Sequence, residues 1–122
     1  MNAPLVVFRA DAGGANGSGH VRRCRALSAV FRNAGWRTAF ATDEASIDTV
    51  AEMGDGSETV AFVDGAAGPE QQARELGEAW PSGIQLLVSD HYGLDAVFEK
   101  AARRSAHRIA AGVSWARAAH KA

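Results

Sequence analysis

The chain has a single cysteine and almost no net charge. Because Cys24 is the only cysteine among the 122 residues, the chain cannot form an internal disulfide or a metal cluster held by several thiolates. The formal net charge of −1 gives no reason to expect nucleic acid or an anionic membrane as a partner. No apolar run is long enough to span a bilayer, and the first residues show no basic segment followed by an apolar signal region. We therefore expect a soluble, cytoplasmic protein.

Short apolar runs alternate with segments of helical spacing along the chain. The apolar runs predict strands at residues 5–9, 36–42, 58–63, 84–89 and 108–113. The other segments predict helices at residues 20–33, 69–80 and 94–104, a short helix that ends at residue 53, and a weak helix at 114–122. Gly35 is expected to end the first helix, and Asp43 or Ser46 to cap the short one. Strands that are apolar almost throughout are typical of a parallel sheet buried on both faces, so the chain predicts an α/β fold.

A glycine-rich segment from Gly13 to Gly19 connects the first predicted strand to the first predicted helix. Glycines allow main-chain amides to approach a phosphate closely, and the helix N-terminus adds unpaired N–H groups and the positive end of its dipole. Two better-known phosphate loops do not fit. A P-loop needs Lys and then Ser or Thr where His20 and Val21 stand, and Arg22 replaces the third glycine of the dinucleotide fingerprint. A nicotinamide cofactor is therefore not expected.

His20 is the candidate general base, and Asp11 is a candidate to assist it. The helix dipole disfavours a protonated ring at His20, and a neutral imidazole can accept a proton as a general base does. Alternatively, His20 only caps the turn or contacts a phosphate. Asp11 either orients His20 or bonds to loop amides, or it shapes the turn through its own backbone.

Arg22, Arg23 and Arg25 lie in the first turns of the same predicted helix. Cations at this end oppose the helix dipole, so we expect a compensating anion. That anion is either a ligand phosphate or a carboxylate such as Asp11. The alternative is a solvated basic face.

A second polar segment, Asp90-His91-Tyr92-Gly93, follows the fourth predicted strand. An acid, an imidazole and a phenol at a strand end can hold a polar ligand, although the same tetrapeptide is also typical of a simple turn. Because parallel strands project their carboxyl ends onto one rim, this segment and the glycine loop are expected to lie together. The histidines show no metal-ligand spacing, so we expect no metal, and Cys24 is expected to pack as a small hydrophobe.

Three motifs together resemble the N-terminal half of a family of nucleotide-sugar hydrolases, the UDP-2,4-diacetamido-2,4,6-trideoxy-β-L-altropyranose hydrolases of pseudaminic acid biosynthesis. The motifs are Phe8-Arg9-Ala10-Asp11, Gly17-Ser18-Gly19-His20-Val21-Arg22-Arg23-Cys24 and Ser89-Asp90-His91-Tyr92-Gly93. The resemblance covers roughly residues 5 to 108. Gly-x-Gly-His-x-x-Arg alone is shared with the wider group of GT-B glycosyltransferases, and Asp-His-Tyr-Gly narrows the match.

The resemblance implies a Rossmann-like domain, the N-terminal one of a GT-B-type fold, with substrate held between two such domains. It also implies cleavage of the sugar C1–O bond by water, with inversion, release of UDP, and no metal or cofactor. His20 is then the catalytic base. The residues expected to bind the UDP-sugar are Gly17, Ser18, Gly19, Asp11 and Tyr92, and those expected to support the site are Arg22, Asp90 and His91.

The end of the chain departs from the family pattern. By the resemblance, we expect residues 1–111 to form the N-terminal domain and residues 112–122 an atypical tail, without the family's C-terminal nucleotide-binding domain. A shifted reading frame or a truncated gene would produce this tail. We expect weak or no activity from the chain alone, and a C-terminal domain or a partner chain to complete the site. The alternatives are half of a GT-B glycosyltransferase, with His20 near an acceptor hydroxyl, and a non-catalytic module that binds a phosphate ligand.

Overall fold

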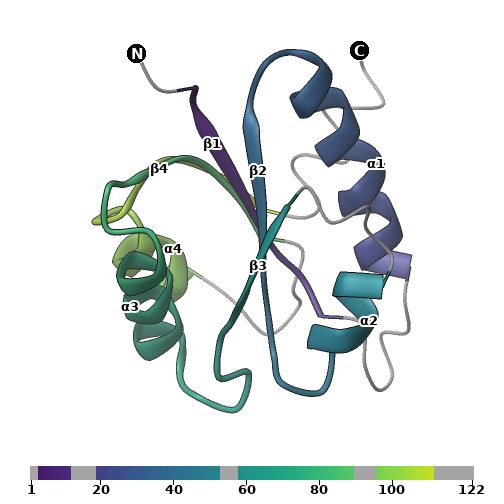
Figure 1. Cartoon of the computed structure of the whole chain (residues 1–122). Helices are drawn as coiled ribbons and strands as arrows, with labels where there is room; N and C mark the ends of the chain where they lie inside the picture. Colours follow the sequence, from purple (N-terminus) through teal and green to yellow (C-terminus); the bar gives the residue numbers. More distant parts are fainter. Residues whose placement is uncertain (1–2, 12–18, 53–57, 90–95, 112–122) are drawn as a thin grey trace.

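The computed structural model describes residues 3–11, 19–52, 58–89 and 96–111. The strands within these ranges are β1 (Leu5–Arg9), β2 (Arg37–Thr42), β3 (Thr59–Phe62), β4 (Ile84–Ser89) and β5 (Ala106–Ala111). The helices are α1 (Gly19–Asn33), α2 (Ile47–Glu52), α3 (Pro69–Ala79) and α4 (Ala96–Ala102). Strand and helix alternate, as the sequence predicts (Figure 1).

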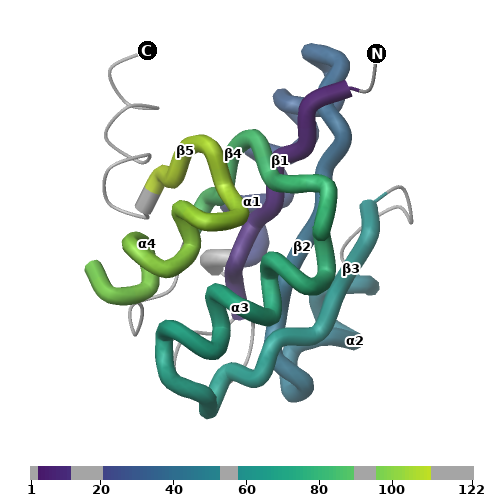
Figure 2. The backbone as a smooth tube through the Cα atoms, turned by 90° about the vertical axis from the view of Figure 1, so that its left-hand side faces the viewer, coloured from purple at the N-terminus to yellow at the C-terminus, as the bar shows by residue number. Residues whose placement is uncertain are grey.

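The described strands form one five-stranded sheet in the order β3-β2-β1-β4-β5, and every neighbouring pair is parallel. Figure 2 shows this order from β5 on the left to β3 on the right. The predicted α/β fold with a parallel sheet flanked by helices is therefore confirmed, and it is consistent with a Rossmann-like fold. The strand order reverses between β1 and β4, which is the point where sheets of this kind bind ligands.

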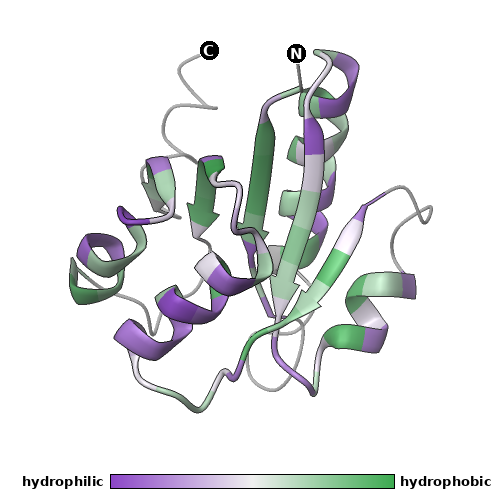
Figure 3. Cartoon of the chain, turned by 60° about the vertical axis from the view of Figure 1, so that its left-hand side comes forward, coloured by the Kyte–Doolittle hydropathy of each residue, from purple (hydrophilic) through white to green (hydrophobic). Residues whose placement is uncertain are grey.

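Helices cover both faces of the sheet. In Figure 1, α1 and α2 lie on one side of the strands, whereas α3 and α4 lie on the other. Alternate side chains of β1 explain this arrangement, because Val6 and Phe8 pack into the core under α1 and α2, whereas Leu5 and Val7 pack into the core under α3 and α4. Figure 3 shows the central strands coloured largely as hydrophobic, whereas the helices carry both colours. Cys24 is fully buried in the α1 core, so its predicted packing role is confirmed.

The predicted position of the last strand is wrong by two residues at its start. We expected this strand at residues 108–113, but β5 begins at Ala106, which is in register with Ile84 at the start of β4. His107 and Arg108 are exposed on this edge strand, and so the usual apolar run does not mark where pairing begins. The helix predicted at 94–104 is shorter, since α4 ends at Ala102. The weak helix predicted at 114–122 lies outside the described residues.

Gly35 follows the end of α1 and has a φ of +92°, a conformation that favours glycine. A Cβ added at Gly35 would meet no atom within 4 Å, so only the backbone conformation opposes substitution. We expect Gly35→Ala to lower the free energy of unfolding by about 1–2 kcal/mol. Gly68→Ala is the control, because Gly68 has a φ of −67° and equally open space. Urea denaturation of both variants checks the prediction, and equal losses would contradict it.

Candidate functional site

The glycine-rich segment and the Asp-His-Tyr-Gly segment follow strands that end side by side at the carboxyl edge of the sheet. β1 ends at Arg9 and β4 ends at Ser89, and these two residues are register partners in adjacent parallel strands. The chain therefore leaves β1 and β4 side by side, on the two sides of the point where the strand order reverses. The expectation of one shared rim is confirmed for these two departure points.

The structure places some of the predicted site residues along this edge. Asp11 is buried beyond the end of β1, and Gly19 and His20 provide the first two main-chain positions of α1. Arg22 is exposed on the same helix. The other predicted site residues lie outside the described residues; they are Gly17, Ser18, Asp90, His91 and Tyr92.

Arg9 is a buried charged residue at this edge, and it is not among the site residues predicted from the sequence. It occupies the last position of β1, on the α3 side after Leu5 and Val7, and its exposed fraction is 0%. Its Nη1 atom lies 2.6 Å from Asp11 Oδ1. Its Nε and Nη2 atoms donate to Gln72 Oε1 on α3, at 3.2 and 3.1 Å. A buried guanidinium needs several partners of this kind to offset its lost hydration.

Asp11 connects the ends of two strands through a single oxygen. Besides the bond from Arg9, Oδ1 accepts hydrogen bonds from Thr42 Oγ1 at 3.2 Å and from the main-chain N–H of Asp43 at 2.8 Å. Asp11 therefore bonds to a main-chain amide of the loop after β2, whereas residues 12–18, the loop whose amides we expected it to bond, lie outside the described residues. With 6% of its surface exposed, Asp11 holds β1 and β2 together at the edge where the motifs begin.

Among the first arginines of α1, Arg25 pairs with a carboxylate other than Asp11. Arg25 Nη1 lies 2.7 Å from Glu58 Oε1, its Nη2 donates to the carbonyl of Val50, and its guanidinium carbon lies 4.2 Å from the centre of the Phe40 ring. Asp11, the carboxylate that we proposed for this role, pairs with Arg9. The expected carboxylate is therefore present for Arg25, but it is Glu58 and not Asp11, and Glu58 comes close only once β3 is in place.

Glu58 is the anion of a largely buried ion pair, with 1% of its side chain exposed against 12% for Arg25. We expect Glu58→Gln to lower the free energy of unfolding by about 1.5–3 kcal/mol, because Arg25 then keeps its charge without a counter-ion. Thermal and urea denaturation measure the loss. Glu78→Gln, on the exposed surface of α3, is the control. Equal stability of the two variants would contradict the prediction.

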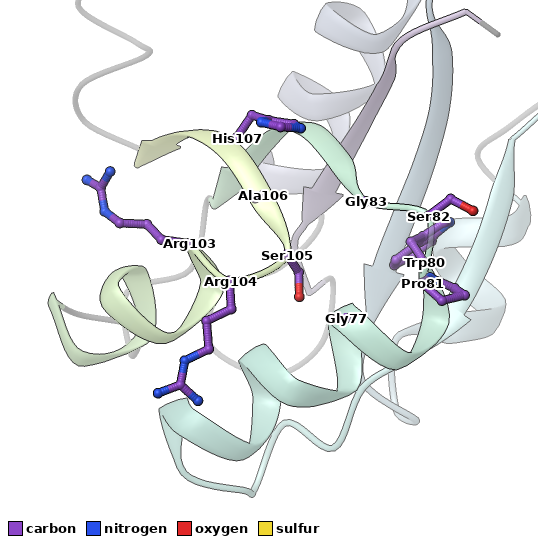
Figure 4. A pocket seen from close by; sticks show the side chains of 10 residues that line it. All are labelled: Gly77, Trp80, Pro81, Ser82, Gly83, Arg103, Arg104, Ser105, Ala106 and His107. Carbon is purple, nitrogen blue, oxygen red and sulfur yellow. The ribbon is translucent and has the colours of Figure 1, made fainter.

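Two cavities lie away from the carboxyl edge. One of about 450 Å³ is lined at the start of β4 and β5 by Trp80, Arg103, Arg104, His107 and their neighbours. Arg103 and Arg104 extend away from one another there (Figure 4). They follow α4, where the helix dipole favours cations, so their charge has a structural explanation. A groove of about 910 Å³ runs between α3 and α4. Asp11 and Arg22, the predicted site residues whose side chains the structure describes, line neither cavity.

The described part of the chain holds no candidate metal site and no candidate membrane span. Within these ranges, no group of three or more His, Cys, Asp or Glu side chains is placed to hold a metal ion. No helix in this part of the chain has both the length and the apolar character needed to cross a bilayer.

Comparison of the chain with protein-family models, curated proteins and solved structures found no match. What the site can do therefore follows from its residues and geometry. One sequence signal for the missed residue does exist, since Arg9 ends an apolar strand two positions before Asp11. Side chains two apart in extended chain point to the same side, and opposite charges there are typical of a pair. Gln72 carries no such signal, because it lies 63 positions from Arg9.

Proposed function

We propose that this chain is the base-carrying domain of a nucleotide-sugar hydrolase. The enzyme uses water to cleave the C1–O bond of UDP-2,4-diacetamido-2,4,6-trideoxy-β-L-altropyranose and releases UDP. One observation supports the proposal above the others. The Gly-x-Gly-His motif runs into the first turn of α1, on the edge where the Asp-His-Tyr-Gly segment also begins. Parallel sheets bind their ligands at such an edge.

The diphosphate is the part of the substrate that the helix end suits best. The first main-chain N–H groups of a helix have no partner within the helix, and the dipole there attracts negative charge. Gly17, Ser18 and Gly19 precede or open α1, and with little side-chain bulk they let main-chain amides reach the phosphate oxygens. We therefore assign the diphosphate to this end of α1, with the sugar next to it.

In the proposed reaction, His20 accepts a proton from a water molecule. The water oxygen forms a bond to C1, and the C1–O bond to UDP breaks with its electron pair leaving on the phosphate oxygen. The positive dipole end of α1 favours the neutral imidazole, which is the form that accepts a proton. Attack on the side opposite to UDP inverts C1. Tyr92 and Asp11 are assigned supporting contacts to the sugar side of the site.

The test is hydrolysis of this UDP-sugar in water enriched in ¹⁸O. Cleavage at C1 places the label in the sugar, whereas attack at phosphorus places it in UDP. The full chain is assayed alone and with a separately produced C-terminal domain from the resembling family. Label in UDP, or no turnover in either assay, would contradict the proposal.

Two other outcomes would point to the alternatives. Sugar transfer to an added acceptor without hydrolysis would favour a GT-B glycosyltransferase half, in which His20 faces an acceptor hydroxyl. Binding of the UDP-sugar in calorimetry without turnover would favour a module that only binds a phosphate ligand. Both measurements use the same protein preparation and the same substrate.

A further inference from the structure

The contacts around Arg9 continue beyond Asp11 and Gln72 into a closed ring. Gln72 accepts from Arg9 through Oε1, and its Nε2 donates to the carbonyl of Ala67 at 2.9 Å. Ala67 belongs to the loop between β3 and α3. Asp11, on the other side of Arg9, bonds to the main-chain N–H of Asp43 in the loop after β2. Arg9 therefore stands between two loops that come from different strands.

Gly65 closes the ring. A Cβ added at Gly65 would lie 2.9 Å from Asp43 Cβ, so the loop after β3 is in close contact with the loop after β2. The ring thus joins the chain ends of β1, β2 and β3 to the first turns of α3. We call it the carboxyl-edge ring, and its members are Arg9, Asp11, Asp43, Gly65, Ala67 and Gln72.

We infer that Arg9 and Gln72 are positioning residues for the segment that carries the proposed base. Gln72 fixes the guanidinium from α3, and the guanidinium fixes Asp11, the residue from which the chain continues toward His20. This inference rests on the proposed hydrolase function for its effect on catalysis. Its structural part, that α3 holds the end of β1 in place through Gln72, stands apart from that function.

The hydrogen bonds of the ring hold the Arg9 side chain in one defined orientation at this edge. Gln72 Oε1 accepts two bonds from one planar guanidinium, and Arg9 Nη1 meets Asp11 at 2.6 Å. Arg9 and Gln72 are 0% and 3% exposed, so water competes little for these bonds. A planar guanidinium donates hydrogen bonds in fixed directions, whereas the ammonium group of lysine does not. Because a misplacement of about 1 Å near reacting atoms can cost about 10²-fold in rate, a remote glutamine in this ring can affect turnover.

The test compares Gln72→Met with Gln71→Met, which makes the same change at an exposed neighbouring position of α3. Amide hydrogen exchange is followed at Ala10, which donates to Ala41 O at 3.2 Å, and at Asp43. The amide of Ile84, bonded to Ser105 O at the opposite edge, is the internal reference. We expect Gln72→Met to speed exchange at Ala10 and Asp43 by about tenfold relative to Ile84, and Gln71→Met to leave the ratio unchanged. Equal acceleration at all three amides would overturn the inference.

Turnover of the UDP-sugar provides the second readout. We expect Gln72→Met to lower kcat by about tenfold with KM changed by less than about twofold, because the base is displaced while the diphosphate contacts remain. Gln72→Glu keeps an acceptor for Arg9 and is expected to recover most of the lost kcat. A loss of kcat that merely follows the folded fraction, or no recovery in Gln72→Glu, would overturn the positioning role. If the unmodified chain hydrolyses the substrate neither alone nor with the added C-terminal domain, the proposed function fails, and amide exchange still decides the structural role of the ring.

Discussion

Replacement of Arg9 by methionine is expected to lower the free energy of unfolding by about 3–5 kcal/mol. Methionine is an unbranched side chain of similar length and fills much of the same buried space. It removes the cation that faces Asp11, which is only 6% exposed, and it removes both donors to Gln72 Oε1. The loss therefore comes mainly from the buried charge of Asp11, which no longer faces Arg9, and from Gln72 Oε1, which loses both donors from Arg9, and less from the bonds of Arg9 themselves.

A double variant separates these two contributions. Arg9→Met combined with Asp11→Asn removes the buried anion together with its cation, while an amide oxygen remains for Thr42 and the Asp43 N–H. We expect it to be more stable than Arg9→Met alone. Urea denaturation gives the midpoints, and unchanged slopes show that the same two states are compared. A loss below about 1 kcal/mol in Arg9→Met would contradict the prediction, since exposed ion pairs have effects of that size.

If Arg9→Met is too unstable to purify, Arg9→Lys replaces it in the test. The expected loss is a large fraction of the stability of a typical domain, which is only about 5–15 kcal/mol. Lysine keeps the charge opposite Asp11 but cannot present a planar pair of donors to Gln72. We expect a loss between those of the unmodified chain and Arg9→Met. If Arg9→Lys is as stable as the unmodified chain, the charge of Arg9 alone, without the two bonds to Gln72, accounts for its contribution to stability.

Replacement of His20 by alanine is expected to lower the rate of UDP release from the UDP-sugar by about 10²–10⁴-fold. The main chain of His20 stays in the first turn of α1, and alanine is a good helix former, so α1 is expected to persist. Binding of UDP itself is expected to change little, because the diphosphate is assigned to main-chain amides. Calorimetry with UDP and a UDP-release assay measure the two effects separately.

His107→Ala is the matched control for His20→Ala. His107 is exposed on β5 and lines the cavity at the opposite edge of the sheet. We expect this variant to release UDP at the unmodified rate. Full activity in His20→Ala would remove His20 from the reaction, whereas equal losses in both variants would show a general effect of losing a histidine.

The sequence predicts the architecture well where one face of each element is apolar. The run Leu5–Arg9 and the three- and four-residue spacing that includes Cys24 depend only on local burial, and both elements are found as predicted. Gly35 ends α1 through a backbone conformation that glycine favours, which is again a local property. β5 is misplaced because its exposed His107 and Arg108 interrupt the apolar signal at an edge strand.

The sequence predicts where the candidate site lies in the sheet, but it does not predict which side chains contact one another there. Parallel topology alone places the ends of β1 and β4 together, so the rim follows from the pattern of strands. The partners of Arg9 and Arg25 do not follow, because Gln72 and Glu58 reach them only after α3 and β3 have docked. Sequence spacing holds no information about such contacts between distant segments.

The strand order has a consequence for the nascent chain. β1 is made first, yet it lies at the centre of the sheet between β2 and β4. While residues 84–89 are still unmade, one edge of β1 presents unpaired N–H and C=O groups, and Val7 lacks Leu87 beside it. Open edges of this kind pair readily with other chains, and contacts between distant segments form slowly. We therefore expect the half-synthesised domain to be prone to aggregation until β4 docks against β1.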